Sequence, residues 1–124
     1  MSYSYQTRRS NSGEPFPRPG RESSLSTTEL RRYRIADGQA DAFTDWFRRA
    51  AVTRQPYGFE VEFAYLDRTT GDFVWAVRHA GDLERFVEAE RQWRADPERA
   101  RVFADLPDCL LEAHTAKVEP VPTA

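Results

Sequence analysis

Residues 59–79 read FEVEFAYLDRTTGDFVWAVRH, and this stretch decides the fold. Two runs rich in aromatic and β-branched residues flank a loop at 68–72 that contains a glycine for a left-handed turn position. The stretch therefore predicts a β-hairpin with strands at 59–67 and 73–79. Bulky apolar side chains occur in both phases of these strands, so both faces of the sheet need a cover. The side chains expected to share one face of the first strand are Phe59, Val61, Phe63 and Tyr65.

Amphipathic helices are predicted on both sides of the hairpin. Upstream, Asp37 is expected to cap a helix over about 39–52. Its apolar stripe consists of Ala40, Phe43, Phe47, Ala50 and Ala51. Downstream, Asp82 is expected to cap a second helix, and Asp96 a short third one that begins at Pro97. The predicted inner face of the second helix carries Leu83, Phe86, Val87, Glu90 and Trp93.

Two further strands, at 28–35 and about 109–118, complete the order βαββαβ. This order predicts an α+β, ferredoxin-like fold with a four-stranded antiparallel sheet. Right-handed crossovers place the helices on one face of that sheet. The other face would expose a large apolar patch on a monomer, so we expect a homodimer in which two sheets pair.

Composition and charge indicate the extent of the domain and limit the classes of function. The domain is expected at 27–119, between a disordered N-terminal tail at 1–26, which is rich in Pro, Gly, Ser and Arg, and a C-terminal tail at 120–124. A formal net charge of −2 gives no broad attraction to nucleic acid or to an anionic membrane. No apolar run approaches the roughly 20 residues of a membrane span. The single cysteine forbids an internal disulfide and favours a cytoplasmic location.

Three side chains are candidates for catalysis. His79 ends its strand in phase with Trp75 and could serve as a general base, or could simply bond to neighbours at a strand end. Arg31 and Tyr33 share a face of the first strand, which the topology places beside the third. Together these groups could bind and polarise an enolate, phenolate or carboxylate at an apolar cavity. The predicted ligand-binding residues are Phe73, Trp75 and Val77.

Less demanding roles are available for the same residues. Arg31 could form an ion pair with Glu60 or Glu62, or an ion pair at an interface, and one β-bulge would reverse the facing of a strand. His79 and His114 with a glutamate could form a metal triad only in principle, because the first strand separates them. No metal and no cofactor is expected.

A set of short motifs, in order along the chain, resembles the NIPSNAP family. Residues 29–35 (ELRRYRI) are similar to its opening Glu-Leu-Arg-x-Tyr strand, and 93–98 (WRADPE) to its Trp-x-x-Asp-Pro-Glu stretch. The other motifs are Gly38, 57–61 (YGFEV), and 77–79 (VRH) with 82–85 (DLER). His79 and Val77 stand where the family usually has tyrosine and tryptophan.

The resemblance implies the dimeric α/β-barrel superfamily, in which two ferredoxin-like subunits pair their sheets. That superfamily includes cofactor-independent monooxygenases, haem-degrading enzymes and polyketide cyclases. The NIPSNAP family has no shared catalytic motif to carry over, so the resemblance implies the fold more than the reaction.

The expected function is the binding of an apolar or aromatic small molecule. In one interpretation the chain is a cofactor-independent oxygenase, cyclase or isomerase of bacterial specialised metabolism. In the alternative it is a non-enzymatic dimeric interaction or ligand-carrier module. A polar-lined pocket open to solvent near His79 would favour the enzyme, and a sheet face filled by packed side chains would favour the module.

Overall fold

The computed structural model describes residues 26–123. The tail expected at 1–26 lies outside them, apart from Ser26, which opens the first strand. The elements in chain order are β1 (Ser26–Ile35), α1 (Ala40–Arg54), the 3₁₀ turn η2 (Gln55–Tyr57), β2 (Phe59–Asp67), β3 (Asp72–Ala80), α2 (Leu83–Arg94), α3 (Pro97–Phe103) and β4 (Leu110–Val118).

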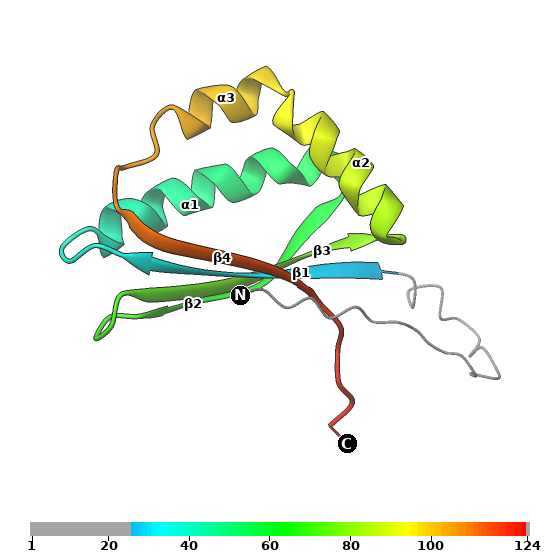
Figure 1. Cartoon of the computed structure of the whole chain (residues 1–124). Coiled ribbons are helices and arrows are strands. Elements are labelled where there is room, and N and C mark those ends of the chain that lie inside the picture. Colours follow the sequence, from blue (N-terminus) through cyan, green and yellow to red (C-terminus); the bar gives the residue numbers. More distant parts are fainter. Residues whose placement is uncertain (1–25, 124) are drawn as a thin grey trace.

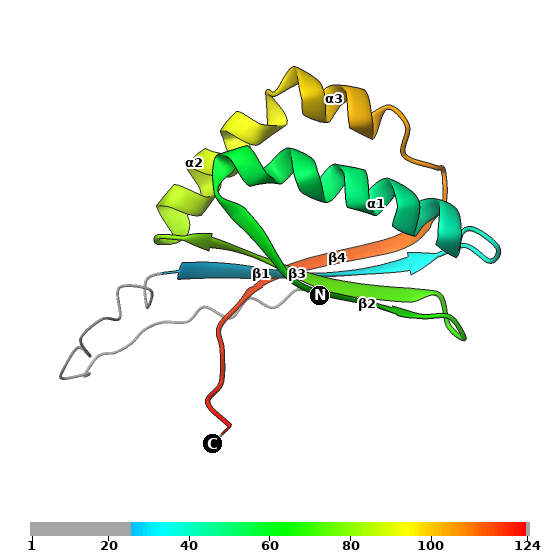
Figure 2. The same cartoon turned by 180° about the vertical axis from the view of Figure 1, so that it is seen from behind.

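The strands form one four-stranded sheet in the order β2-β3-β1-β4, and every pairing is antiparallel. All three α-helices lie on the same face of this sheet, as the views from front and back show (Figure 1, Figure 2). The predicted α+β ferredoxin-like fold is confirmed. In the described part of the chain, no helix is long and apolar enough to cross a membrane.

The core fills the space between the helices and the sheet. Phe43 of α1 is fully buried, and its ring lies 5.0 Å from that of Phe73 and 5.8 Å from that of Tyr33. Val77 of β3 and Phe86 of α2 are likewise inaccessible to solvent. These contacts follow from the apolar stripe of α1 meeting one phase of β1 and β3.

A β-bulge changes the predicted facing of β2. The register of β2 against β3 shifts between Val61 and Phe63, so that Glu62 is the extra residue. Phe59 and Val61 face the helices, whereas Phe63 and Tyr65 face the opposite side of the sheet. The expectation that all four share one face is therefore wrong beyond Val61, because the bulge depends on strand pairing and not on the local pattern.

The helix caps are partly as predicted. The side chains of Asp82 and Asp96 accept backbone N–H bonds of 3.0 and 2.8 Å from the first turns of α2 and α3. Asp37 does not cap α1, which begins after Gln39 without a side-chain cap. The inner face of α2 is also narrower than predicted, since its buried residues are Phe86, Ala89 and Trp93.

The face of the sheet without helices carries a mixed surface. Its exposed apolar part includes Phe63 and Tyr65 of the edge strand β2, which are 38% and 68% exposed. Nearby, Arg78 of β3 bonds to both Glu60 and Glu62 at 2.5 and 2.8 Å. These two carboxylates therefore pair with Arg78 on this face, and not with Arg31, which lies on the helix side.

Candidate functional site

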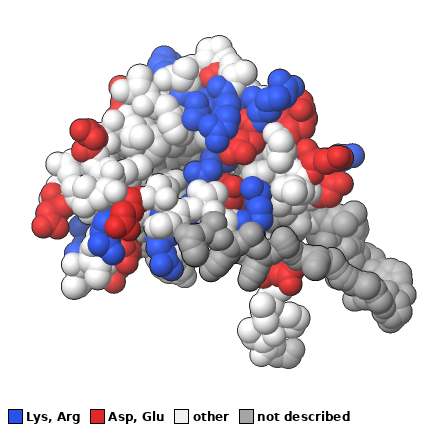
Figure 3. Space-filling model, viewed as in Figure 1, with Lys and Arg blue, Asp and Glu red and all other residues white. Residues whose placement is uncertain are grey.

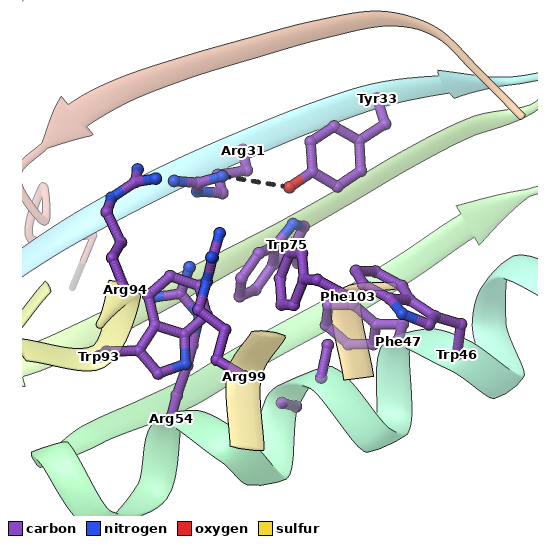
Figure 4. A pocket seen from close by; sticks show the side chains of 12 residues that line it. Arg31, Tyr33, Trp46, Phe47, Arg54, Trp75, Trp93, Arg94, Arg99 and Phe103 are labelled. Atoms are coloured by element: carbon purple, nitrogen blue, oxygen red, sulfur yellow. Dashed lines mark hydrogen bonds between the residues drawn. The ribbon is translucent and has the colours of Figure 1, made fainter. Parts of the chain in front are cut away.

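A cavity of about 120 Å³ lies between the helices and the sheet (Figure 4). Its walls are largely aromatic, and the rings belong to Tyr33, Trp46, Phe47, Trp75, Trp93 and Phe103. The rings support one another: Phe47 packs edge-on against Trp75, and Trp46 against Phe103, each with 4.9 Å between ring centres. Hydrogen bonds fix two of the indoles, because Trp46 Nε1 donates to the Val102 carbonyl and Trp93 Nε1 to the Thr53 hydroxyl, both at 2.9 Å.

The helical layer leaves the β4 side of this space open. Ala113 and Thr115 of β4 pair with Tyr33 and Arg31 of β1, so they face the helix side of the sheet. Both nevertheless remain exposed, because no helix covers them. A space-filling view shows a hollow between the helices and the sheet with basic side chains gathered around it (Figure 3).

Four arginines line the cavity: Arg31, Arg54, Arg94 and Arg99. Arg31 is held from the sheet side, since its Nε donates to Glu29 at 2.8 Å and its Nη1 to the Tyr33 hydroxyl at 3.3 Å. The Glu90 carboxylate lies 3.7 Å from Arg31 Nη2 and 3.4 Å from Arg94. Two of the four arginines therefore share the carboxylates at the edge of the cavity.

Glu29 is the buried counter-ion of this network. It is 2% exposed and accepts from Lys117 Nζ at 3.0 Å as well as from Arg31. Burial alone would raise the pKa of Glu29, but the positive charges of Arg31 and Lys117 outweigh it and hold that pKa below its usual value. The carboxylate is therefore ionised, and it is paired with both Arg31 and Lys117.

Arg54 and Arg99 have a different environment. Arg54 is only 4% exposed, and in the described part of the chain no carboxylate lies within 4.0 Å of either guanidinium. Both lie over the Trp93 ring, with 3.8 Å from Arg54 Cζ and 4.5 Å from Arg99 Cζ to the ring centre. Burial, and next the nearby charge of Arg31, lowers the pKa of Arg54 to about 10.

The cavity also contains unpartnered donors. Among the described residues, the buried side-chain polar atoms without a hydrogen-bond partner are Arg54 Nη1, Arg99 Nε and Trp75 Nε1. All three belong to side chains that line this one cavity. Buried donors in folded proteins are almost always paired, so this concentration makes the cavity the candidate functional site.

The architecture is shared with solved structures of low sequence identity. A NIPSNAP family protein of unknown function from Agrobacterium tumefaciens superposes with a TM-score of 0.71 at 16% identity, over 81% of this chain and 92% of that one. An uncharacterized NIPSNAP domain protein from Burkholderia xenovorans gives 0.69 at 16% identity, over 79% and 97%. The chain has a NIPSNAP-like fold.

The same fold extends to a second group of proteins. SnoaB, a cofactor-independent oxygenase from Streptomyces nogalater, superposes on the NIPSNAP-like chain with a TM-score of 0.60 at 18% identity, over 80% of this chain and 96% of that one. In sequence alone, the chain matches neither a known family profile nor a curated protein.

Three of the predicted site residues meet at the cavity of this NIPSNAP-like fold. Arg31 pairs directly with Trp75 across β1 and β3, and Tyr33 lies two residues further along the same face. Phe73 and Val77 share that face but are 3% and 0% exposed and pack in the core without lining the cavity.

His79 lies apart from these residues. Its Nδ1 is 2.7 Å from the Ala80 carbonyl oxygen, and its Nε2 is 2.9 Å from that of Tyr57. Both ring nitrogens therefore face backbone carbonyl oxygens, and His79 does not line the cavity. His114 lies on the other face of the sheet, and the described residues bring together no group of three potential metal ligands.

Sequence reasoning did not single out Arg54, Arg94 or Arg99. A signal for Arg54 was nonetheless present, because it follows Phe47 and Ala50 at helical spacing and so continues the apolar stripe of α1. A charged residue in a buried stripe needs a partner or a function. Arg94 lies within the 93–98 motif and Arg99 directly follows it, and only the packing of α2 and α3 against the sheet brings them to the cavity.

Proposed function

We propose that this NIPSNAP-like protein binds a small aromatic molecule in the cavity between its helices and its sheet. The observation that carries the proposal is the ring-lined cavity with unpartnered donors in its wall. Pockets of this kind, apolar with a few convergent polar groups, are the usual form of small-molecule sites.

The size of the cavity favours one aromatic ring. An apolar protein cavity of about 150 Å³ accommodates benzene, and this cavity measures about 120 Å³ and has an open side. A polyketide of several fused rings exceeds this volume. The ligand class favoured is therefore a monocyclic aromatic molecule.

Two functions are candidates for a protein that binds such a molecule: an enzyme and a non-enzymatic carrier. A cofactor-independent enzyme of bacterial specialised metabolism, as an oxygenase, cyclase or isomerase, is supported by the fold shared with SnoaB, a cofactor-independent oxygenase. In that case Arg31 and the Tyr33 hydroxyl are placed to stabilise an enolate or phenolate oxygen.

A specific observation favours the second candidate, a non-enzymatic carrier. The predicted catalytic histidine, His79, has both ring nitrogens turned to backbone carbonyl oxygens and does not line the cavity. Catalysis would therefore depend on the arginines and Tyr33 alone. A carrier needs no base in the cavity.

The helix-free face of the sheet supports homodimerisation, which is the other part of the proposal. Phe63 and Tyr65 of the edge strand β2 are exposed on that face, and Ala76 of β3 and Leu30 of β1 follow Phe63 in register across the sheet. Pairing two such faces would bury apolar surface that a monomer leaves in water.

Ligand-detected NMR with benzyl alcohol, a neutral single-ring molecule, tests the binding site. Binding to the native protein and its loss in Ala50→Leu, which fills the cavity from α1, would support the proposal. Ala42→Leu serves as the matched control, because Ala42 is an exposed alanine of the same helix. Equal binding by both variants, with unchanged thermal midpoints, would place the ligand elsewhere and contradict the proposal.

A further inference from the structure

The cavity carries an excess of positive charge. The carboxylates at its edge, Glu29 and Glu90, are already paired with Arg31, Lys117 and Arg94. In the described residues no carboxylate remains for Arg54 and Arg99. A buried guanidinium without a counter-ion destabilises a fold, so an arginine kept in such a place calls for a functional reason.

The cation–π contacts account for part of this arrangement. The Trp93 ring attracts both guanidiniums, and both side chains also line the cavity. Attraction to the ring face does not supply an oxygen acceptor for Arg54 Nη1 or Arg99 Nε, which remain unpartnered. The contacts therefore position the two donor groups for an acceptor in the cavity without replacing that acceptor.

Trp75 adds a third donor of another kind. It is 4% exposed, its Nε1 has no partner, and Arg54 Cζ lies 5.5 Å from the centre of its ring. Figure 4 shows Arg54 and Arg99 beside Trp93 and extending toward the sheet strand that carries Trp75. An indole N–H and two guanidinium edges at one aromatic cavity suit a planar anion attached to a ring.

We propose that the cavity recognises the carboxylate of a monocyclic aromatic acid. Arg54 and Arg99 donate to the carboxylate oxygens, the Trp75 indole N–H adds a further bond, and the aromatic ring of the ligand packs among the rings of the wall. The inference deepens the proposed function and rests on it, since it assumes that an aromatic ligand occupies this cavity.

The test compares three ligands by isothermal titration at neutral pH: benzoate, its neutral counterpart benzyl alcohol, and acetate, which has the carboxylate without the ring. Benzoate is expected to bind at least about tenfold more tightly than either of the others, because hydrogen bonds to a charged group are stronger than neutral ones. The preference is expected to survive added salt in large part, since Arg54 is only 4% exposed.

Arg54→Met is the decisive variant. It is expected to lose the tenfold preference for benzoate over benzyl alcohol. Its thermal midpoint is expected to equal or exceed that of the native protein, because an unpaired buried charge has been removed. Arg48→Met is the matched control, since Arg48 is on the same helix with its side chain 74% exposed, and it should keep the preference.

The outcomes separate the two proposals. If benzoate and benzyl alcohol bind equally, the donors are satisfied by water and the inference of an acid is overturned, while the aromatic site stands. If acetate binds as tightly as benzoate, the site is a simple anion site and the aromatic class is wrong. If Arg54→Met lowers the thermal midpoint and keeps the preference for benzoate, Arg54 is structural and the inference fails. If no aromatic compound binds, the proposed function itself fails.

Discussion

The Tyr57 hydroxyl donates a hydrogen bond of 2.7 Å to Oδ2 of Asp96. Tyr57 belongs to η2 at the end of α1, whereas Asp96 is the residue that caps α3, so the bond joins two segments far apart in sequence. Both residues belong to motifs that resemble the NIPSNAP pattern. The bond fastens the end of α1, which carries Arg54, to the turn between Trp93 and Arg99, and thereby holds two walls of the cavity together.

We expect Tyr57→Phe to lower the thermal midpoint, because it removes this bond and leaves the ring in place. The measurement is a double-mutant cycle with Asp96→Ser, which keeps a helix-capping oxygen but is too short to reach Tyr57. In the Asp96→Ser background, Tyr57→Phe should have little further effect. Additive losses from the two substitutions would show that the bond does not contribute.

Glu29 makes the stability of the domain depend on pH. Its pKa is lowered in the folded state from an ordinary value of 4.5, so its contribution is complete above that value and is lost as the pH falls through the folded-state pKa. Glu29→Gln leaves Arg31 and Lys117 without their shared partner, and breaking a buried pair in this way costs about 3–5 kcal/mol. Urea unfolding at pH 7 should show this loss in the free energy of unfolding.

The difference between the native protein and Glu29→Gln should shrink between pH 4.5 and the acid limit of folding, because the native carboxyl then becomes neutral too. Glu119→Gln, at an exposed position just after β4, is the control and should follow the native protein throughout. A Glu29→Gln deficit that stays constant down to pH 3 would contradict the ionised role of Glu29.

Much of the fold could be predicted because its determinants are local. The apolar stripe of α1 and the caps at Asp82 and Asp96 are readable from a few consecutive residues, and the order βαββαβ then fixes the topology. The exception is the bulge at Glu62. It arises from the pairing of β2 with β3, and no residue pattern within β2 indicates its position. One extra residue turned Phe63 and Tyr65 to the other face of the sheet.

The site was predictable only where topology alone brings residues together. Arg31 and Trp75 are neighbours because β1 and β3 are adjacent, and the order of the strands implied this. Arg54 and Arg99 meet at Trp93 because three helices pack at particular angles, which no spacing in the sequence reports. In the same way, His79 has the expected facing, and its position at the end of β3 separates it from the cavity.

Gly71 and Gly38 offer a matched pair for testing the hairpin. Both have a positive φ, +83° and +80° respectively. A Cβ at Gly71 would lie 2.6 Å from the Ile35 carbonyl oxygen, whereas a Cβ at Gly38 would meet nothing within 4 Å. Gly38→Ala should therefore cost only the conformational strain, about 1–2 kcal/mol, and Gly71→Ala should cost more, because the backbone of β1 must move.

Urea unfolding of the two variants measures this difference directly. The backbone bond of 2.8 Å from Ile35 N–H to the Gly71 carbonyl should be disturbed in Gly71→Ala alone, and the exchange of the Ile35 amide hydrogen reports it. Equal losses in the two variants would mean that the close approach to Ile35 contributes nothing to the requirement for glycine.

The proposed homodimer predicts that a charge introduced on the helix-free face of the sheet separates the subunits. Phe63 is 38% exposed there, and Phe63→Glu places a carboxylate where two sheets would meet, at the cost of burying an unpaired charge. Light scattering at micromolar concentration should change from the mass of two chains to that of one. Val87→Glu is the control, because Val87 is 53% exposed on α2, in the opposite layer, and should remain dimeric. A native mass of one chain, or a dimer that Phe63→Glu leaves intact, would show that this face does not pair two subunits.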